Sequence, residues 1–207
     1  MDVFSDTICP WCYIGFNQLN QALENFNSYN FDIVWRPFQL NPEMPLDGMD
    51  RHQYLTAKFG GENNARSVYQ LIEDEGKKNK IFFQFNKIVK TPNSFLSHKL
   101  LAYAHRKKKQ TDVLELLFYK YFIEGKDIGS LDVLINSSKD ADMYDEHIEK
   151  YLISKEDNDS LLNEEKQAKN IGINSVPCFI FNKEIVINGA QSMKNFIQII
   201  NSLTNNV

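Results

Sequence analysis

Cys9 and Cys12, two cysteines separated by two residues, are the part of this sequence whose spacing best suits chemistry. Pro10 follows the first of them, and proline is common in the first turn of a helix. A helix N-terminus presents unpaired N–H groups and a partial positive charge, which together favour a thiolate. The thiolate is the nucleophile of thiol–disulfide exchange. We therefore expect Cys9 to be the exposed attacking thiol, and Cys12, one turn inside, to be the buried resolving thiol.

A zinc site is the main alternative explanation of such a pair, because two cysteines at this spacing supply half of a tetrahedral site. The remaining ligands are not evident. Cys178 is the only other cysteine, and the four histidines lie in predicted helices without metal-ligand spacing. No metal is predicted.

The composition describes a single globular chain that can bury a core. Of its 207 residues 43% are hydrophobic, and three cysteines are too few for a disulfide-stapled scaffold. With 23 basic and 27 acidic side chains the net charge is -4, which argues against nucleic acid as a partner. The N-terminus has no secretory pattern, and no apolar run approaches the roughly 20 residues of a membrane span. A cytoplasmic protein without membrane association is therefore expected.

Elements of regular structure must hold the cysteine pair. Val3 and Phe4 suggest the end of a strand before the pair, and apolar residues at helical spacing follow it. Residues 31–40 are β-branched and aromatic and predict a second strand. Near the other end, residues 177–181 and 184–187 predict a hairpin that turns at Asn182 and Lys183, and Ser192 is a good N-cap for a last helix. The two ends thus predict βαβ and ββα units.

Between these units the chain shows mainly helical patterns. They predict helices at residues 52–59, 65–75, 94–108, 111–124, 143–152 and 160–170, and a further short helix that begins at Ser130. Gly76 is expected to end the second of these helices, and the apolar stretch 81–86 is ambiguous. The whole is predicted to be an α/β protein with a thioredoxin-like fold, βαβ–ββα, carrying a large all-helical insertion. Its domains are predicted as residues 1–45 with 170–207, and the insertion 46–169.

Several segments, in order along the chain, resemble the DsbA-type thiol–disulfide oxidoreductases, and most of all their cytoplasmic FrnE-like branch. The strongest is Cys9-Pro10-Trp11-Cys12 with its neighbours, in which Pro10 and Trp11 would support the active site. The other matching segments are residues 35–42, 93–94 with His98, 171–177 and 187–191.

The resemblance implies a cis peptide bond between Val176 and Pro177, facing the cysteine pair and able to pair with an extended substrate. Cys178 departs from the family, which more often has an aromatic or apolar residue there. It is either a small buried hydrophobic residue or a third thiol that relays a disulfide. Glu24 is the first acidic residue after the pair and lies too far along the helix to transfer protons. His98 is read as a structural helix residue.

The resemblance implies a dithiol–disulfide oxidoreductase or isomerase acting on protein or small-molecule thiols. The redox-active Cys9–Cys12 pair would need no tightly bound cofactor, although glutathione could serve as a co-substrate. The alternative is a glutathione-dependent isomerase or transferase similar to 2-hydroxychromene-2-carboxylate isomerase, a group that generally carries serine where Cys9 stands. A non-catalytic binding module is a third class, but it would have no use for both thiols. The sequence leaves the physiological substrate and oligomeric state open.

Overall fold

The computed structural model describes residues 1–204, and its centre is a four-stranded mixed sheet. The strands are β1 (Asp2–Ser5), β2 (Val34–Pro37), β5 (Cys178–Phe181) and β6 (Ile185–Asn188), in the spatial order β2-β1-β5-β6. β1 runs parallel to β2 and antiparallel to β5, which forms a hairpin with β6. Asn182 and Lys183 both have positive φ, at 49° and 63°, as the two central residues of a type I′ β-turn do, and the Glu184 N–H donates to the Phe181 carbonyl oxygen at 2.9 Å to close that turn.

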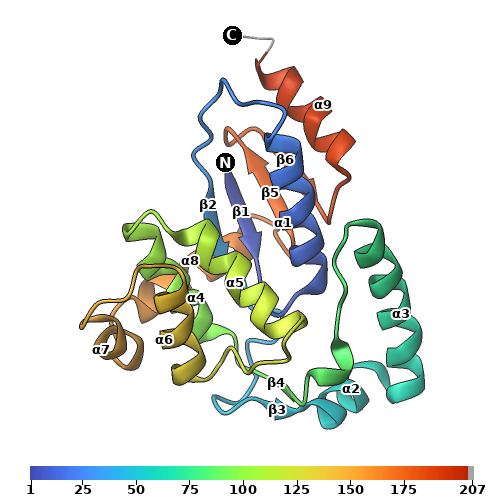
Figure 1. Ribbon diagram of the computed structural model, residues 1–207, viewed down its shortest axis with the longest axis vertical. Coiled ribbons are helices and arrows are strands. Elements are labelled where there is room, and N and C mark those ends of the chain that lie inside the picture. The colour runs from blue at the N-terminus through green and yellow to red at the C-terminus, as the bar shows by residue number, and fades with distance from the viewer. Residues whose placement is uncertain (205–207) are drawn as a thin grey trace.

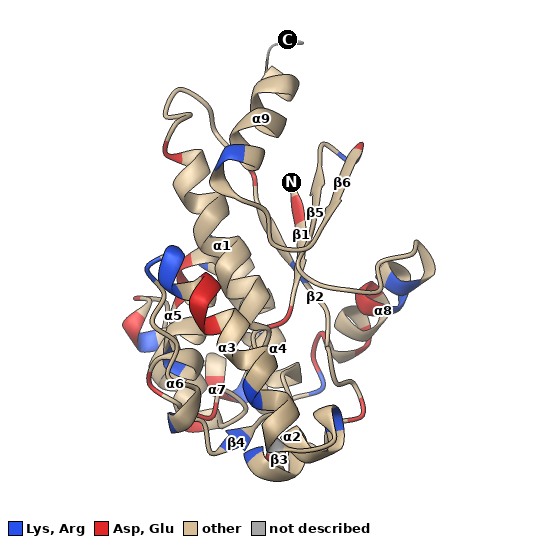
Figure 2. Ribbon diagram, turned by 90° about the vertical axis from the view of Figure 1, so that its right-hand side faces the viewer, with Lys and Arg blue, Asp and Glu red and all other residues tan. Residues whose placement is uncertain are grey.

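Two helices cover one face of this sheet. α1 (Pro10–Leu23) connects β1 to β2, and α9 (Met193–Thr204) follows β6 and packs along α1. Ser192 caps α9 as predicted, since its hydroxyl accepts a hydrogen bond from the backbone N–H of Asn195 at 3.2 Å. Figures 1 and 2 show α1 and α9 together on one side of the strands and α8 on the other. The predicted βαβ–ββα arrangement is confirmed.

The insertion is mainly helical and gathers at one end of the sheet, as Figure 1 shows. Most of the charged residues in Figure 2 lie on it, whereas α1 carries none. Its helices are α2 (Arg51–Phe59), α3 (Glu62–Lys78), α4 (Phe95–Arg106), α5 (Gln110–Phe122), α6 (Leu131–Asp140), α7 (Ile148–Ile153) and α8 (Asn158–Asn170). The division into domains 1–45 with 170–207, and 46–169, stays a prediction. Residues 205–207 lie outside the described part of the chain.

Two details of the insertion differ from the predictions. It is not wholly helical, because β3 (Met49–Asp50) pairs antiparallel with β4 (Lys90–Thr91). Gly76 does not end α3 but lies inside it. A Cβ atom at this glycine would stand 2.6 Å from the ring of Phe83, so the residue permits close packing. The ambiguous stretch 81–86 is a loop that enters a short 3-10 helix, Phe85–Lys87.

The outer edge of β2 is closed by a side chain of α5. The amide of Gln110 accepts a hydrogen bond from the Trp35 backbone N–H and donates one to the Trp35 carbonyl oxygen, both at 2.9 Å. Gln110 thus satisfies the donor and the acceptor that a further strand would otherwise use.

Candidate active site

The turn between β1 and α1 places the two cysteines at the start of α1. Cys9 is the N-cap residue, with extended backbone dihedrals (φ -93°, ψ 114°), and Pro10 opens the helix as predicted. The Cys9 carbonyl oxygen accepts hydrogen bonds from the N–H groups of Cys12 at 3.0 Å and Tyr13 at 3.3 Å. These bonds wind the first turn and bring the two thiols to one end of the helix.

Cys9 is less accessible than the sequence suggests. It is 3% exposed and Cys12 is 1% exposed, so the prediction of an exposed attacking thiol is wrong for this conformation. The segment at Val176 covers Cys9, whose Sγ donates a long hydrogen bond of 3.8 Å to the Val176 carbonyl oxygen. Trp11, at 39% exposed, is the accessible side chain of the motif.

The peptide bond between Val176 and Pro177 is cis, as the resemblance implies. The contact with Cys9 therefore joins α1 to the loop that enters β5. Gly15, on the next turn of α1, makes this approach possible. A Cβ atom at Gly15 would lie 3.1 Å from the Phe179 ring and 3.2 Å from the Pro177 ring, closer than most side-chain contacts.

The surroundings of Cys12 favour its neutral thiol. Burial raises the pKa of Cys12 well above its ordinary value, and the hydrogen bond and charge of Cys9 raise it further. The backbone of Asp6 and the side chain of Ser5 oppose this rise. The Ser5 hydroxyl is buried and has no hydrogen-bond partner of normal geometry within the described residues. Cys12 is thus held protonated beside groups that can stabilise its thiolate.

Asp6, a buried acid that precedes the cysteines, is absent from the sequence-based predictions. Its Oδ1 lies 3.6 Å from Nε2 of His98, with the side chains 0% and 3% exposed. The carboxylate also accepts hydrogen bonds from the backbone N–H groups of Leu40 at 2.7 Å and Ile8 at 3.3 Å. Asp6 therefore ties the cysteine turn to the exit of β2, and His98 is more than a helix residue with local partners.

Helix α4 is fastened to the cysteine turn at a second point. The hydroxyls of Thr7 and Ser97 share a hydrogen bond of 2.7 Å. Asn93, just before α4, donates to the Met44 carbonyl oxygen at 2.6 Å and accepts from the Phe95 N–H at 2.9 Å. The segment 93–98, which the resemblance singles out, thus positions His98 against Asp6.

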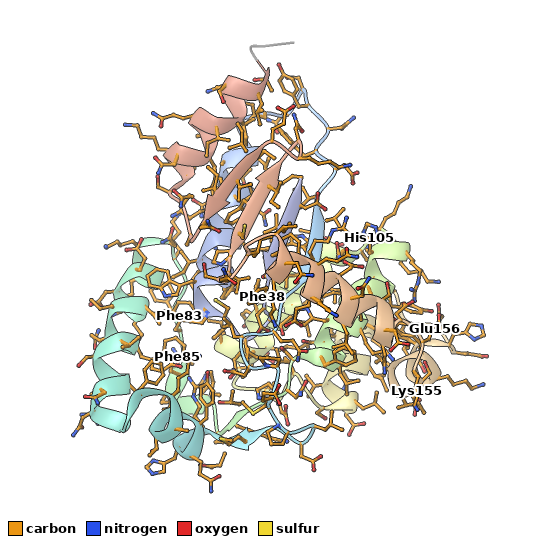
Figure 3. All side chains as sticks on the ribbon, turned by 180° about the vertical axis from the view of Figure 1, so that it is seen from behind. Phe38, Phe83, Phe85, His105, Lys155 and Glu156 are labelled. Atoms are coloured by element: carbon orange, nitrogen blue, oxygen red, sulfur yellow. The ribbon has the colours of Figure 1, made fainter. Side chains whose placement is uncertain are left out.

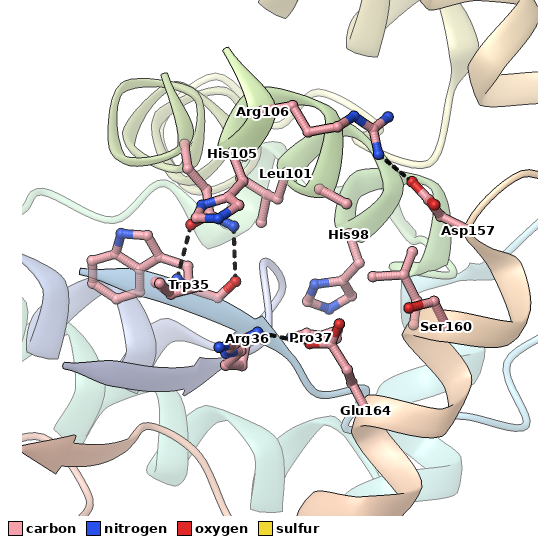
Figure 4. Close-up of a pocket in the computed structure, with 14 residues that line it drawn as sticks. Trp35, Arg36, Pro37, His98, Leu101, His105, Arg106, Asp157, Ser160 and Glu164 are labelled. Carbon is pink, nitrogen blue, oxygen red and sulfur yellow. Dashed lines mark hydrogen bonds and ion pairs between the residues drawn. The ribbon is translucent and has the colours of Figure 1, made fainter. Parts of the chain in front are cut away.

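Beyond His98 a cavity of about 180 Å³ opens between β2, α4 and α8, as Figure 4 shows. Two ion pairs lie in its wall: Arg36 with Glu164 at 3.4 Å, and Arg106 with Asp157. Neither predicted active-site cysteine lines this cavity, so it is distinct from the cysteine pair.

Cys178 lies on β5, opposite Phe4 in the sheet register, and is 0% exposed. Burial raises its pKa. Glu24 is the C-cap residue of α1, at the opposite end of the helix from the cysteine pair. Within residues 1–204, His, Cys, Asp and Glu side chains do not gather in threes as a metal site would need. In the same part of the chain, every helix is too short or too polar to cross a membrane.

The sheet order, the cysteine pair at a helix start and the facing cis-proline define a protein with a thioredoxin-like fold. The pattern of the DSBA-like thioredoxin domain matches residues 1–201, and the chain belongs to that family. It is also similar to the uncharacterised protein YwbO of Bacillus subtilis, with 22% identity over 89% of this chain and 87% of that protein.

Solved structures share the fold over nearly the whole chain. A probable DsbA oxidoreductase from Streptomyces coelicolor superposes with a TM-score of 0.88 at 22% identity, covering 100% of this chain and 90% of that one. The cytosolic disulfide reductase DsbM of Pseudomonas aeruginosa superposes with a TM-score of 0.72 at 13% identity, covering 100% of this chain and 98% of that one. A 2-hydroxychromene-2-carboxylate isomerase superposes with a TM-score of 0.69 at 12% identity, covering 99% of this chain and 94% of that one.

Proposed function

We propose that this chain is a dithiol–disulfide oxidoreductase or isomerase that exchanges disulfides with protein or small-molecule thiols through Cys9 and Cys12. The carrying observation is the contact of 3.8 Å between the Cys9 thiol, at the start of α1, and the carbonyl oxygen before the cis-proline, Pro177. A substrate strand that paired with Val176 would present its sulfur to Cys9. Pro10 and Trp11 shape the helix start that holds both thiols.

The reaction proceeds in two exchanges. The Cys9 thiolate attacks one sulfur of a substrate disulfide, so that a mixed disulfide forms and the first substrate thiolate leaves and takes a proton. Cys12 then loses its proton and attacks the sulfur of Cys9, which forms the Cys9–Cys12 disulfide and expels the second substrate thiolate. Two electrons pass from the cysteine pair to the substrate. The reverse sequence oxidises a substrate dithiol.

Insulin reduction with a thiol reductant tests this function. Cys9→Ala should abolish the activity, and full activity in that variant would overturn the proposal. Cys12→Ala should accumulate mixed disulfides through Cys9, detectable by mass spectrometry. The redox potential of the pair then sets the direction: a value near about -270 mV marks a reductant and one near about -120 mV an oxidant.

A glutathione-dependent isomerase is the second candidate, supported by the fold shared with 2-hydroxychromene-2-carboxylate isomerase. Such an activity should require glutathione and survive Cys12→Ala, whereas dithiol chemistry should not. Under the first proposal no tightly bound cofactor is needed, and glutathione is a co-substrate at most.

A cytoplasmic location and membership of the FrnE-like branch stay predictions. The fold shared with a cytosolic disulfide reductase supports the location. Fractionation of cells that produce the full-length protein tests it.

A further inference from the structure

The insertion builds a cationic cluster around Arg51, at the start of α2. One guanidinium nitrogen donates to the Thr91 hydroxyl at 3.0 Å and another to the Tyr69 hydroxyl at 2.7 Å. The guanidinium carbon lies 5.0 Å from the ring centre of Tyr69 and 5.5 Å from that of Tyr54. The partners of this cation are therefore neutral hydroxyls and aromatic faces.

A second cation and a buried hydroxyl extend the cluster. Nζ of Lys58 donates to the Tyr54 hydroxyl at 2.7 Å. Tyr121, only 1% exposed, makes no hydrogen bond of normal geometry within the described residues. In that same part of the chain neither Arg51 nor Lys58 forms an ion pair with a carboxylate. The nearby carboxylate of Asp50 accepts a hydrogen bond from a backbone N–H of α2 instead. Among the described side chains, then, the cluster has two cations and no carboxylate paired with either of them.

Aromatic contacts connect this cluster to the helix that carries the cysteines. The ring of Tyr69 lies 4.5 Å from Phe85, which stacks at 4.9 Å on Phe83, and Phe83 meets Tyr13 edge-on at 6.0 Å. Tyr13 directly follows Cys12 in α1. Figure 3 shows Phe83 and Phe85 between α3 and the N-terminal end of α1. Three successive ring contacts thus link the cluster to Tyr13, in the first turns of α1.

The electrostatics of Tyr69 agree with this placement. Burial raises the pKa of Tyr69, Arg51 opposes the rise, and Cys9 adds to it. Next to the cluster a cavity of about 560 Å³ is lined by two cations, Arg51 and Arg66, by the acidic Asp50, and by the rings of Tyr69 and Phe85. That volume suits a small molecule.

We propose that the Arg51 cluster binds the carboxylate of an anionic low-molecular-weight thiol or disulfide while the sulfur of that molecule meets Cys9. This inference rests on the proposed function. A carboxylate would supply the missing counter-ion and could accept hydrogen bonds from the guanidinium and from tyrosine hydroxyls in a partly desolvated site. The chain as a whole has a net charge of -4, so a preference for anions must arise locally.

Alkylation of Cys9 tests the charge preference without any redox step. Iodoacetate and iodoacetamide are nearly equal in size and attack the same thiolate, so the ratio of their rates cancels changes in thiol ionisation. In Arg51→Gln the ratio of iodoacetate to iodoacetamide should fall about tenfold at low ionic strength, and the difference should shrink with added salt. The matched control Lys166→Gln removes one exposed charge from α8 and should keep the wild-type ratio. An unchanged ratio in Arg51→Gln would overturn the inference.

Disulfide exchange separates this inference from the proposed function. Reduced protein should react faster with oxidised glutathione than with the cationic disulfide cystamine, and Arg51→Gln should lose that preference. Arg51→Lys, which keeps the charge, should retain part of the preference, and Lys166→Gln, which lies on α8 away from the cluster, should retain all of it. If no disulfide reacts, the proposed function fails. If all react but charge has no effect, only the inference fails.

The carboxylate could also belong to a protein substrate. A peptide disulfide flanked by glutamate, compared with its glutamine counterpart, separates this source from a small molecule. An equal rate for the two peptides, with the preference for oxidised glutathione intact, supports the small anionic substrate. A preference confined to the peptides overturns it.

Discussion

The carboxylate of Asp6 lies 3.6 Å from the imidazole of His98, and both side chains are buried. This contact joins the turn that carries Cys9 to helix α4. The same carboxylate holds the Leu40 N–H at 2.7 Å, so the turn is tied at once to the sheet and to the insertion.

Asp6→Asn should lower the free energy of unfolding by about 1–3 kcal/mol, because the amide cannot accept on both sides and leaves a buried group unpaired. His98→Asn should cost less, since Nε2 has no hydrogen bond of normal geometry within the described residues. Urea unfolding of both variants measures which of them loses more unfolding free energy. A loss in Asp6→Asn no greater than in His98→Asn would contradict this account of the turn.

Gly15→Ala should loosen the contact between α1 and the cis-proline loop. Alanine favours helix by about 0.5–1 kcal/mol over glycine, but its Cβ would meet Pro177 at 3.2 Å and Phe179 at 3.1 Å. We expect a net destabilisation of about 1–2 kcal/mol from overpacking, with slower reaction of Cys9 with substrate. Thermal unfolding and insulin reduction check the two effects, and Asn163→Ala on α8 controls for the gain in helix propensity. A more stable Gly15→Ala with full activity would show that the loop gives way freely.

The reduced protein should lose stability in alkaline solution through Cys12. Because the pKa of Cys12 is raised above 9.0 in the folded state, the unfolded chain ionises first as pH rises. The contribution of the thiol is complete below about pH 9 and falls by up to about 1.4 kcal/mol per pH unit above it, until the folded-state pKa is reached. Because burial also raises the pKa of Cys178, the two proteins compared both carry Cys178→Ala, which removes the contribution of that thiol. Urea unfolding from pH 7 to 10 should show a smaller loss of unfolding free energy in the double variant Cys12→Ala/Cys178→Ala than in Cys178→Ala alone.

Cys178 should act as a packing residue and not as a third redox thiol. It is fully buried and its pKa is raised, so the thiolate is disfavoured. Cys178→Ala should keep insulin reduction within about twofold and cost about 1 kcal/mol through lost apolar burial. In wild type, a thiol reagent should modify Cys178 only after unfolding. A disulfide from Cys178 to Cys9 or Cys12 during turnover would restore the relay role.

Local patterns were enough to predict the frame of the fold and its cysteine pair. Leu19 and Ala22 recur at helical spacing and are fully buried in α1, so the periodicity of the sequence reports its packing. The hairpin turn at Asn182 and Lys183 followed from its residue types. These features depend on neighbours in sequence, which a single chain displays.

Contacts between distant segments could not be predicted in the same way. Nothing near Asp6 points to His98, because their approach depends on how α4 docks. The strands β3 and β4, two residues each, are too short to show an alternation. Gly76 resembled a helix end, yet its role depends on Phe83, which reaches it only after the chain turns back.

The bonds from Gln110 to Trp35 have a consequence for self-association. Since the amide occupies the backbone groups of Trp35 on the open side of β2, another chain cannot lengthen the sheet there without displacing it. On the opposite margin, β6, the side-chain amide of Gln191 donates to the Asn188 carbonyl oxygen at 3.0 Å and so covers one end of the edge, whereas Val186 further along is 55% exposed. An added strand would therefore meet the least obstruction along the middle of β6, around Val186, and the most at Trp35 of β2.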